Sequence, residues 1–276
     1  MNTLLAPLHE LEEFEQLNRS MKKGEFPINV IGCMDTQKSH MIYGAGASYQ
    51  NRLVITHNEV RAKELVEDLK LYERADAEAD GEAFGEVMYY PAKDFIFFSS
   101  DVHGQAIVKE RLRVIKKLME GEPVTIVTTM DGGMDYCLSF DMYKKHSIRV
   151  KVGDEIDLDQ LRHDLTYIGY ENAGQVEREG EFSVRGGIID IFPLTEDCPY
   201  RIELWGDEVD NIRRIDVESQ RSVETVDEVG IYPAAEIFLE EDQIAAGMRQ
   251  MEEERGKCVR KWKEEGKVEE AARLTQ

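Results

Sequence analysis

The chain has 276 residues, of which 42% are hydrophobic and 33% are charged, and its formal net charge is −22. This length predicts two compact domains, or three if one is small, and the apolar content excludes global disorder. The strong negative charge repels DNA phosphates and argues against a scaffold that binds duplex DNA.

The N-terminus and the cysteines indicate where the protein works. Residues 1–20 alternate leucine with glutamate and lack the apolar core of a signal peptide, and the chain contains no run of 18 apolar residues. The four cysteines lie far apart, without a C-x-x-C pair: Cys33, Cys137, Cys198 and Cys258. We therefore expect a cytoplasmic protein with free thiols, no zinc site and no membrane contact.

The first part of the chain shows alternating helix and strand patterns. Residues 5–20 have apolar positions spaced by three, which predicts one amphipathic helix, and the apolar run 28–31 predicts a short strand. After a turn, a helix is expected to about Tyr43, and residues 53–56 form a second predicted strand. Asn58 is a suitable N-cap for the helix that follows.

The alternation continues to about residue 138. The acidic, alanine-rich stretch 74–85 is interpreted as a solvated loop, and strands are expected at 86–90 and 124–128. Between these two strands, a helical stripe is formed by Val108, Leu112, Ile115 and Met119. The fold class is therefore α/β, with a parallel sheet flanked by helices in a first domain of residues 1–138.

The pattern changes in residues 139–229. Apart from a helix at 158–165, short strands are predicted at 182–185, 188–192, 200–205 and 209–215, and Gly, Pro and Asp residues separate them. This is the pattern of an inserted antiparallel α+β domain. Residues 230–276 are predicted to be helical and to complete the first domain.

One stretch partly matches a phosphate-binding loop. Gly32, Lys38 and Ser39 occupy the positions of G-x-x-x-x-G-K-[ST], but Gln37 replaces the second glycine, which lets the backbone close around phosphates. Three interpretations remain open: a strand–turn–helix with a chance Lys-Ser pair, a degenerate nucleotide site, or a working site. Because the six histidines are scattered and no acid–base pair stands out, we expect no catalytic or metal-binding residues.

The strongest motif lies in residues 169–222. It contains Gly-Glu-Phe-Ser-Val-Arg-Gly-Gly at 180–187, Arg-Ile-Glu-Leu-Trp-Gly-Asp-Glu-Val at 201–209 and Ser-Gln-Arg-Ser at 219–222. This stretch resembles the UvrA-binding domain shared by UvrB and the bacterial transcription-repair coupling factors. The glycine-rich run and the Gln-Arg-Ser ending resemble the coupling-factor version, and the similarity covers most of residues 28–240.

The resemblance implies a fold and a function. Residues 1–138 would be similar to the first domain of UvrB with a degenerate P-loop, and residues 139–229 to its second domain. The chain would be a non-catalytic N-terminal module that recruits UvrA in nucleotide excision repair and needs no cofactor itself. In the longer protein, later domains would form an ATP- and magnesium-dependent DNA translocase that displaces stalled RNA polymerase.

The resemblance also indicates the residues that would contact UvrA. Arg185 is the first choice, because it lies where the similarity to UvrB is tightest and UvrB contacts UvrA through an arginine. Two other basic contact positions of UvrB fall on Ser183 and Asn172, so those charges are missing. The remaining candidates are Arg178, Phe182, Arg201 and Arg213.

Other interpretations stay open. The arginines could pair with local carboxylates on a strand face, which contributes about 0–1 kcal/mol per exposed pair. The chain could instead be a nucleotide-dependent, UvrB-type helicase component of the excision nuclease, which would require ATP near Lys38. It could also dock against another domain of its own longer protein through the same surface.

Overall fold

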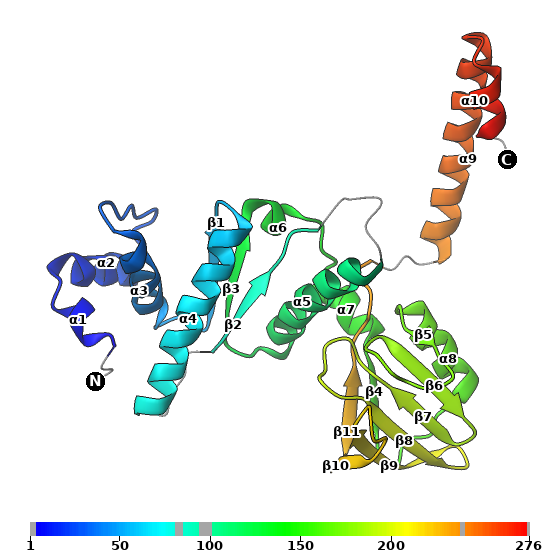
Figure 1. The fold of residues 1–276 in the computed structure, drawn as a ribbon, viewed down its shortest axis with the longest axis horizontal. Coiled ribbons are helices and arrows are strands. Elements are labelled where there is room, and N and C mark those ends of the chain that lie inside the picture. Colours follow the sequence, from blue (N-terminus) through cyan, green and yellow to red (C-terminus); the bar gives the residue numbers. More distant parts are fainter. Residues whose placement is uncertain (1–3, 81–84, 94–100, 238–240, 275–276) are drawn as a thin grey trace. The chain divides into compact units, whose positions relative to one another are not determined.

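The computed structural model describes residues 4–80, 85–93, 101–237 and 241–274 (Figure 1). The chain forms two compact units, Met1–Glu236 and Ile237–Gln276. The first unit contains a parallel sheet with helices and an antiparallel part, so the predicted mixed α/β class is confirmed at this level. In the described residues, no helix is both long enough and apolar enough to cross a bilayer.

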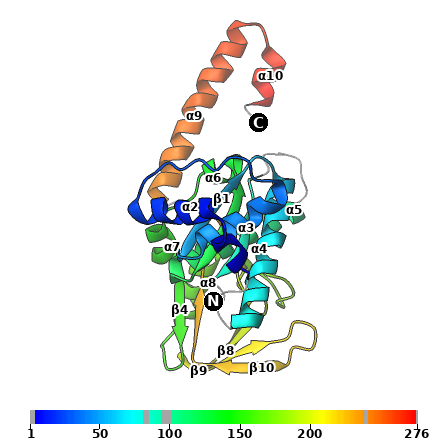
Figure 2. The same cartoon turned by 90° about the vertical axis from the view of Figure 1, so that its left-hand side faces the viewer.

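The first part of this unit is built on a three-stranded parallel sheet in the order β1-β3-β2. Its strands are β1 (Asn51–Thr56), β2 (Glu86–Tyr90) and β3 (Val124–Thr129). Its helices are α1 (Ala6–His9), α2 (Glu12–Lys23), α3 (Asp35–Gly46), α4 (Glu59–Asp80), α5 (Asp101–Glu120), α6 (Met130–Met134) and α7 (Phe140–His146). Helices α4 and α5 lie on opposite sides of the sheet, and α2 and α3 lie beyond α4 (Figures 1 and 2).

Apolar burial between α4 and the sheet organises this part. Leu65 and Leu69 on α4 pack in one cluster with Val87 of β2 and Val127 of β3, and burial of such side chains stabilises the fold by about 1.5–3 kcal/mol each. The Asn58 side chain accepts a 2.8 Å hydrogen bond from the Arg61 backbone N–H, so the predicted N-cap is confirmed.

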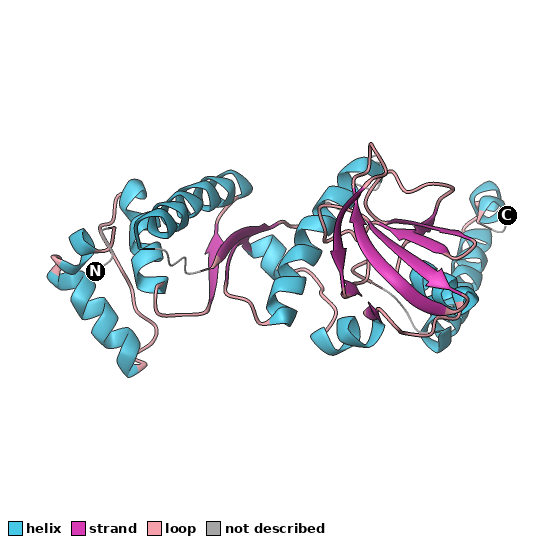
Figure 3. Cartoon of the chain, turned by 90° about the horizontal axis from the view of Figure 1, so that it is seen from below, coloured by secondary structure: helices cyan, strands magenta, loops and turns pink. Residues whose placement is uncertain are grey.

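The second part, which we call the β module, contains a six-stranded sheet in the order β10-β9-β8-β7-β6-β5 (Figure 3). These strands are β5 (Glu171–Asn172), β6 (Glu181–Arg185), β7 (Ile188–Ile191), β8 (Tyr200–Trp205), β9 (Glu208–Ile215) and β10 (Ser222–Val226). β4 (Ile148–Lys151) and β11 (Glu228–Ile231) form a separate antiparallel pair. Helix α8 (Leu158–Tyr167) contributes Leu161 and Leu165 to the core beneath the large sheet.

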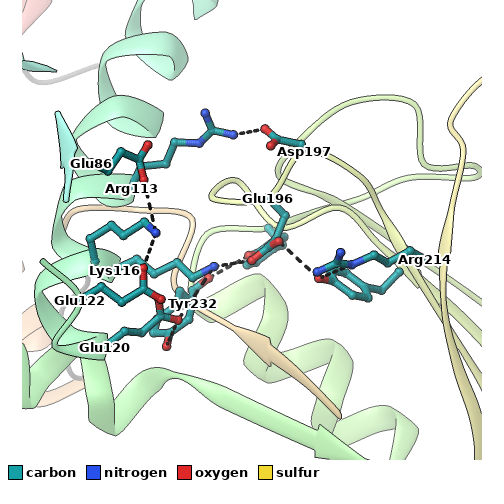
Figure 4. Close-up of polar contacts among 12 residues, drawn as sticks. Glu86, Arg113, Lys116, Glu120, Glu122, Glu196, Asp197, Arg214 and Tyr232 are labelled. Atoms are coloured by element: carbon teal, nitrogen blue, oxygen red, sulfur yellow. Dashed lines mark hydrogen bonds and ion pairs between the residues drawn. The ribbon is translucent and has the colours of Figure 1, made fainter. Parts of the chain in front are cut away.

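A row of ion pairs joins α5 to the β module, and Figure 4 shows two of them, Arg113 with Asp197 and Lys116 with Glu196. Lys109, Arg113 and Lys116 lie one helical turn apart on one side of α5. They pair with Glu179, Asp197 and Glu196 of the β module, respectively. We call these three pairs the α5 seam.

A buried arginine holds the segment that leaves the β module. The Arg111 side chain is fully buried, and its Nε donates a 2.6 Å hydrogen bond to Glu236. Its Nη1 donates to the Pro91 carbonyl at 2.7 Å, and its guanidinium carbon lies 4.1 Å from the centre of the Tyr90 ring. A buried charge is stable only with hydrogen-bond partners. Arg111 on α5 therefore holds Glu236 next to the end of β2.

The second unit is a helical hairpin. It consists of α9 (Glu241–Glu264) and α10 (Val268–Arg273), which contact each other, and Ala271 is buried. The helix predicted for residues 230–276 is therefore confirmed within 241–273, whereas residues 230–231 belong to strand β11. That residues 230–276 complete the first domain stays a prediction.

Three local predictions are wrong. Residues 5–20 form two helices rather than one, because the backbone at Leu11 is extended. Residues 28–31 form no strand, and the Ile31 side chain is 92% exposed. The stretch from Arg74 continues α4 to Asp80 instead of forming a loop, because alanine and glutamate favour helix and the inward side chains Glu73 and Asp76 are buried. Residues 81–84 lie outside the described residues.

Candidate functional site

The residues that matched a phosphate-binding loop lie in and before the first turns of α3. No strand precedes them, so the strand–loop–helix context of a P-loop is absent from residues 28–46. The Gln37 side chain accepts a 3.1 Å hydrogen bond from the Met34 N–H, and Lys38 Nζ lies 2.7 Å from an Asp35 carboxylate oxygen.

The chemistry of this segment does not favour a nucleotide. The Lys38 hydrogen bond lowers the pKa of Asp35, which places a carboxylate where phosphate would need cations. Ser39 is buried, and its hydroxyl donates to the Thr36 carbonyl at 3.4 Å. The backbone at Gly32 has a positive φ of 91°, a conformation that favours glycine whether or not a phosphate is bound. The groove of about 610 Å³ beside Lys38 is lined mainly by apolar side chains, from Leu17, Val30, Ile31, Met41 and Ile42.

The outward face of the large sheet in the β module brings the predicted arginines together. Strand alternation places Phe182, Ile189 and Ile202 in the core and their neighbours on the opposite face. The strand register aligns Ser183, Asp190, Arg201 and Arg213 in one row across β6, β7, β8 and β9. Arg185, Ile188 and Glu203 form the next row on the same face.

Asp190 is the centre of this face. Its side chain is 1% exposed, and it accepts a 2.6 Å hydrogen bond from Arg185 Nη2. Arg201 donates two further bonds to it, from Nε at 2.6 Å and from Nη2 at 2.9 Å. A buried carboxylate needs such partners, and its hydrogen bond raises the pKa of Arg201. Two guanidinium groups therefore share one carboxylate, which leaves one positive charge uncompensated.

Arg185 is the more accessible of the two arginines. Its side chain is 49% exposed, whereas that of Arg201 is 19% exposed. Among the described residues, its one hydrogen bond uses Nη2 and leaves Nε and Nη1 for a ligand. Both arginines can thus contribute charge to a surface, and Arg185 can also make new hydrogen bonds there.

The remaining arginine candidates are neutralised locally. Arg178 pairs with both Glu171 and Glu181, and Arg213 pairs with Glu203 on β8. Burial alone would raise the pKa of Glu181, but hydrogen bonds from Glu177 and Arg178 lower it. Local pairing, the alternative expected from the sequence, therefore describes Arg178 and Arg213 well.

Phe182 cannot reach a partner. Its side chain is fully buried in the β-module core, so its place among the contact candidates is wrong. Side chains alternate between the two faces of β6, so Phe182 points into the core while Ser183 and Arg185 lie on the other face. Ser183 is also buried and donates to the Gly174 carbonyl at 3.1 Å, whereas Asn172 is exposed.

Sequence reasoning missed two residues of this face, Trp205 and Ile188. Trp205 is 84% exposed at the end of β8, next to the turn into β9. Side chains of a strand alternate between its two faces, and Tyr200 and Ile202 of β8 are buried. Trp205 therefore lies on the outward face with Arg201 and Glu203. This alternation could have identified Trp205 from the sequence. Ile188, in the neighbouring row, is also exposed. We call Arg185, Ile188, Arg201 and Trp205 the binding face.

The described residues contain no group of three His, Cys, Asp or Glu side chains that could hold a metal ion. Burial raises the pKa of the Cys137 and Cys198 thiols, which disfavours reactive thiolates. The absence of catalytic residues and of a cofactor stays a prediction.

Comparisons with known proteins agree with this picture of the β module. Residues 148–237 match the family model described as the UvrB interaction domain. The chain is 34% identical over 246 residues to a transcription-repair-coupling factor of Staphylococcus aureus (strain USA300), covering 89% of this chain and 20% of the relative. It is 30% identical over 256 residues to that of Bacillus subtilis (strain 168), covering 91% and 21%. The chain thus spans about a fifth of the length of the curated relatives it matches.

Proposed function

We propose that this chain, a homologue of transcription-repair-coupling factors whose β module matches the UvrB interaction domain, recruits UvrA through the binding face. The observation that carries the proposal is the buried Asp190 shared by Arg185 and Arg201. It organises two guanidinium groups on an exposed face of an otherwise acidic protein. The partner follows from the similarity, and the contact residues follow from the geometry.

The chemistry of the binding face suits an acidic protein surface. Arginine can bind a carboxylate through two parallel hydrogen bonds, and arginine and tryptophan are enriched among the residues that dominate binding energy. Arg185 would supply the new hydrogen bonds, and Trp205 and Ile188 would supply apolar area around them.

We further propose that the chain is a non-catalytic module of a longer cytoplasmic protein. In that protein, an ATP- and magnesium-dependent DNA translocase would lie outside these residues and would displace stalled RNA polymerase. The first part would be a degenerate P-loop domain similar to that of UvrB, completed by residues 230–276. Its support is the parallel order β1-β3-β2 and the remnant Gly32, Lys38 and Ser39.

The binding face could also be covered within the longer protein. A half-exposed arginine and an exposed tryptophan on one face of the sheet would serve an intramolecular partner as well as UvrA. If another domain masks this face, the 276-residue chain should bind UvrA more tightly than the longer protein does. Equal affinity would argue against masking.

Titration of purified UvrA with the chain tests the proposed function. We expect saturable binding whose dissociation constant rises with salt, because the contact pairs guanidinium groups with carboxylates across a partly exposed surface. The same titration with duplex DNA in place of UvrA should show no comparable binding. Absence of a complex with UvrA at low salt would contradict the proposal.

A further inference from the structure

The loop between β9 and β10 contains an unusual backbone conformation. Gln220 has a φ of +56°, and it is the one non-glycine residue with positive φ in the described parts of the chain. A side chain in this left-handed region crowds the backbone and costs free energy, so glycine or asparagine is the usual choice. Such a conformation persists only where the surrounding structure requires it.

Hydrogen bonds close the loop around Gln220. Its backbone N–H donates to the Asp216 carbonyl at 2.8 Å, and the Asp216 N–H donates to the Arg221 carbonyl at 2.9 Å. The Asp216 carboxylate accepts from the Ser219 N–H at 2.8 Å and from its hydroxyl at 2.6 Å. Backbone groups and the Asp216 and Ser219 side chains therefore supply most of the hydrogen bonds that close the loop.

The Gln220 amide links this loop to the binding face. Its Nε2 donates to the Val217 carbonyl at 2.9 Å, and its Oε1 accepts from Arg201 Nη2 at 3.1 Å. The amide has one workable orientation here, because a carbonyl only accepts and a guanidinium only donates. Arg201 is thus held between Asp190 on one side and Gln220 on the other.

These contacts use the whole Nη2 group of Arg201. One of its hydrogens goes to Asp190 and the other to Gln220, while Nε also goes to Asp190. The same Asp190 oxygen that accepts from Arg201 Nη2 accepts from Arg185 Nη2. Arg201 and Arg185 therefore share one acceptor oxygen, so the orientation of the Asp190 carboxylate links the two guanidinium groups.

We propose that Gln220 is a positioning residue for UvrA binding: it orients Arg201, and through Asp190 it orients Arg185, without touching the partner. This proposal rests on the proposed function. A glycine would adopt the left-handed backbone with less strain but would leave Arg201 without its second acceptor. The strained glutamine is thus explained by what its amide holds rather than by the turn.

The test compares Gln220→Gly with Gln220→Met in the full chain. Gln220→Gly removes the acceptor and relieves the strain, so UvrA affinity should fall about tenfold while the thermal midpoint stays equal or rises. Gln220→Met keeps the strained backbone and a side chain of similar length but offers no acceptor to Arg201, so its UvrA affinity should fall by a similar factor. Parent-like affinity of Gln220→Met, or a loss of affinity in Gln220→Gly that accompanies a lower midpoint, would overturn the proposal, since either would indicate a structural role alone.

A double-mutant cycle identifies the route of the effect. In an Arg201→Ala background, Gln220→Gly should leave UvrA affinity unchanged, because the residue through which it acts is gone. The same tenfold loss in that background would contradict the proposal. Exchange of the Arg201 Nη2 hydrogens, followed by NMR, needs no UvrA: it should accelerate in Gln220→Gly, and an unchanged rate would overturn the positioning role even if UvrA does not bind.

Discussion

The two cationic segments of the first unit differ in what holds their charged side chains. Lys38, in the segment that matched a phosphate loop, pairs with an exposed carboxylate three residues away in the same helix. Arg185 and Arg201 pair with Asp190, a buried carboxylate on a neighbouring strand. A local pair can form wherever helix spacing permits, whereas the cluster on the β module depends on the register of three strands.

This difference indicates where binding chemistry is organised. The exposed Lys38–Asp35 pair contributes little and leaves no net charge. The Asp190 cluster is partly desolvated, so its hydrogen bonds are stronger and its extra positive charge has a fixed position. We therefore expect substitutions in the β module to have large effects and substitutions at Lys38 to have almost none.

The largest effect on stability is expected from Asp190→Asn. It removes the carboxylate that neutralises Arg185 and Arg201 and leaves their charges in partly buried positions. We expect the free energy of unfolding, measured in urea, to fall by about 2–3 kcal/mol. Asp210→Asn on the exposed side of β9 is the control and should change it by less than about 0.5 kcal/mol. If both variants lowered the free energy of unfolding equally, the buried Asp190 would be no more important for stability than the exposed Asp210.

A large effect on UvrA affinity, without an effect on stability, is expected from Trp205→Ala. Because its side chain is 84% exposed in the free chain, its removal should leave stability unchanged. If Trp205 is buried against UvrA, affinity should fall by about 2 kcal/mol, or roughly thirtyfold. Val223→Ala, another exposed apolar residue of the same sheet, should bind like the parent chain. Unchanged binding by Trp205→Ala would restrict the contact to the arginines.

A moderate effect is expected from the α5 seam. Replacing Lys109, Arg113 and Lys116 by alanine should lower the free energy of unfolding by about 1–2 kcal/mol at low salt and by less at high salt. Lys63→Ala with Lys70→Ala, whose carboxylate partners lie within α4, is the control and should cost less than about 1 kcal/mol. A triple variant as stable as the parent chain would show that the seam does not hold the β module.

The smallest effect is expected at the first cationic segment. Lys38→Ala should change the free energy of unfolding by less than about 0.5 kcal/mol, because its ion pair is exposed. Titration with a fluorescent ATP analogue and magnesium should show no saturable binding to either the parent chain or the variant. Binding of the ATP analogue to the parent chain but not to Lys38→Ala would contradict this expectation. It would support the nucleotide-dependent alternative.

The sequence predicted the β module better than the first part of the chain, for physical reasons. Alternation of apolar and polar residues sets both the strands and the buried face of the module, so residues such as Ile189 and Ile202 could be assigned in advance. The run 28–31 has no partner strand among the described residues, and a short apolar run alone cannot identify one. The length of α4 depended on burial of Glu73 and Asp76, which are tertiary contacts.

The candidate site was predictable only in part. The resemblance indicated Arg185, and the structure places it on an accessible face. Its pairing with Asp190, and the contact between Arg201 and Gln220, depend on strand register and on a loop conformation that no local pattern specifies. The exposure of Trp205 follows from strand parity, but only once the end of β8 is known.

The most direct test of the central claim is the UvrA affinity of Arg185→Ala compared with Arg162→Ala. The two arginine side chains are similarly exposed, 49% and 43%, and each pairs with one carboxylate, but Arg162 lies on α8, away from the binding face. We predict that Arg185→Ala weakens UvrA binding by about 2 kcal/mol, or roughly thirtyfold, and that Arg162→Ala has no effect. Equal affinity of the two variants for UvrA would contradict the account.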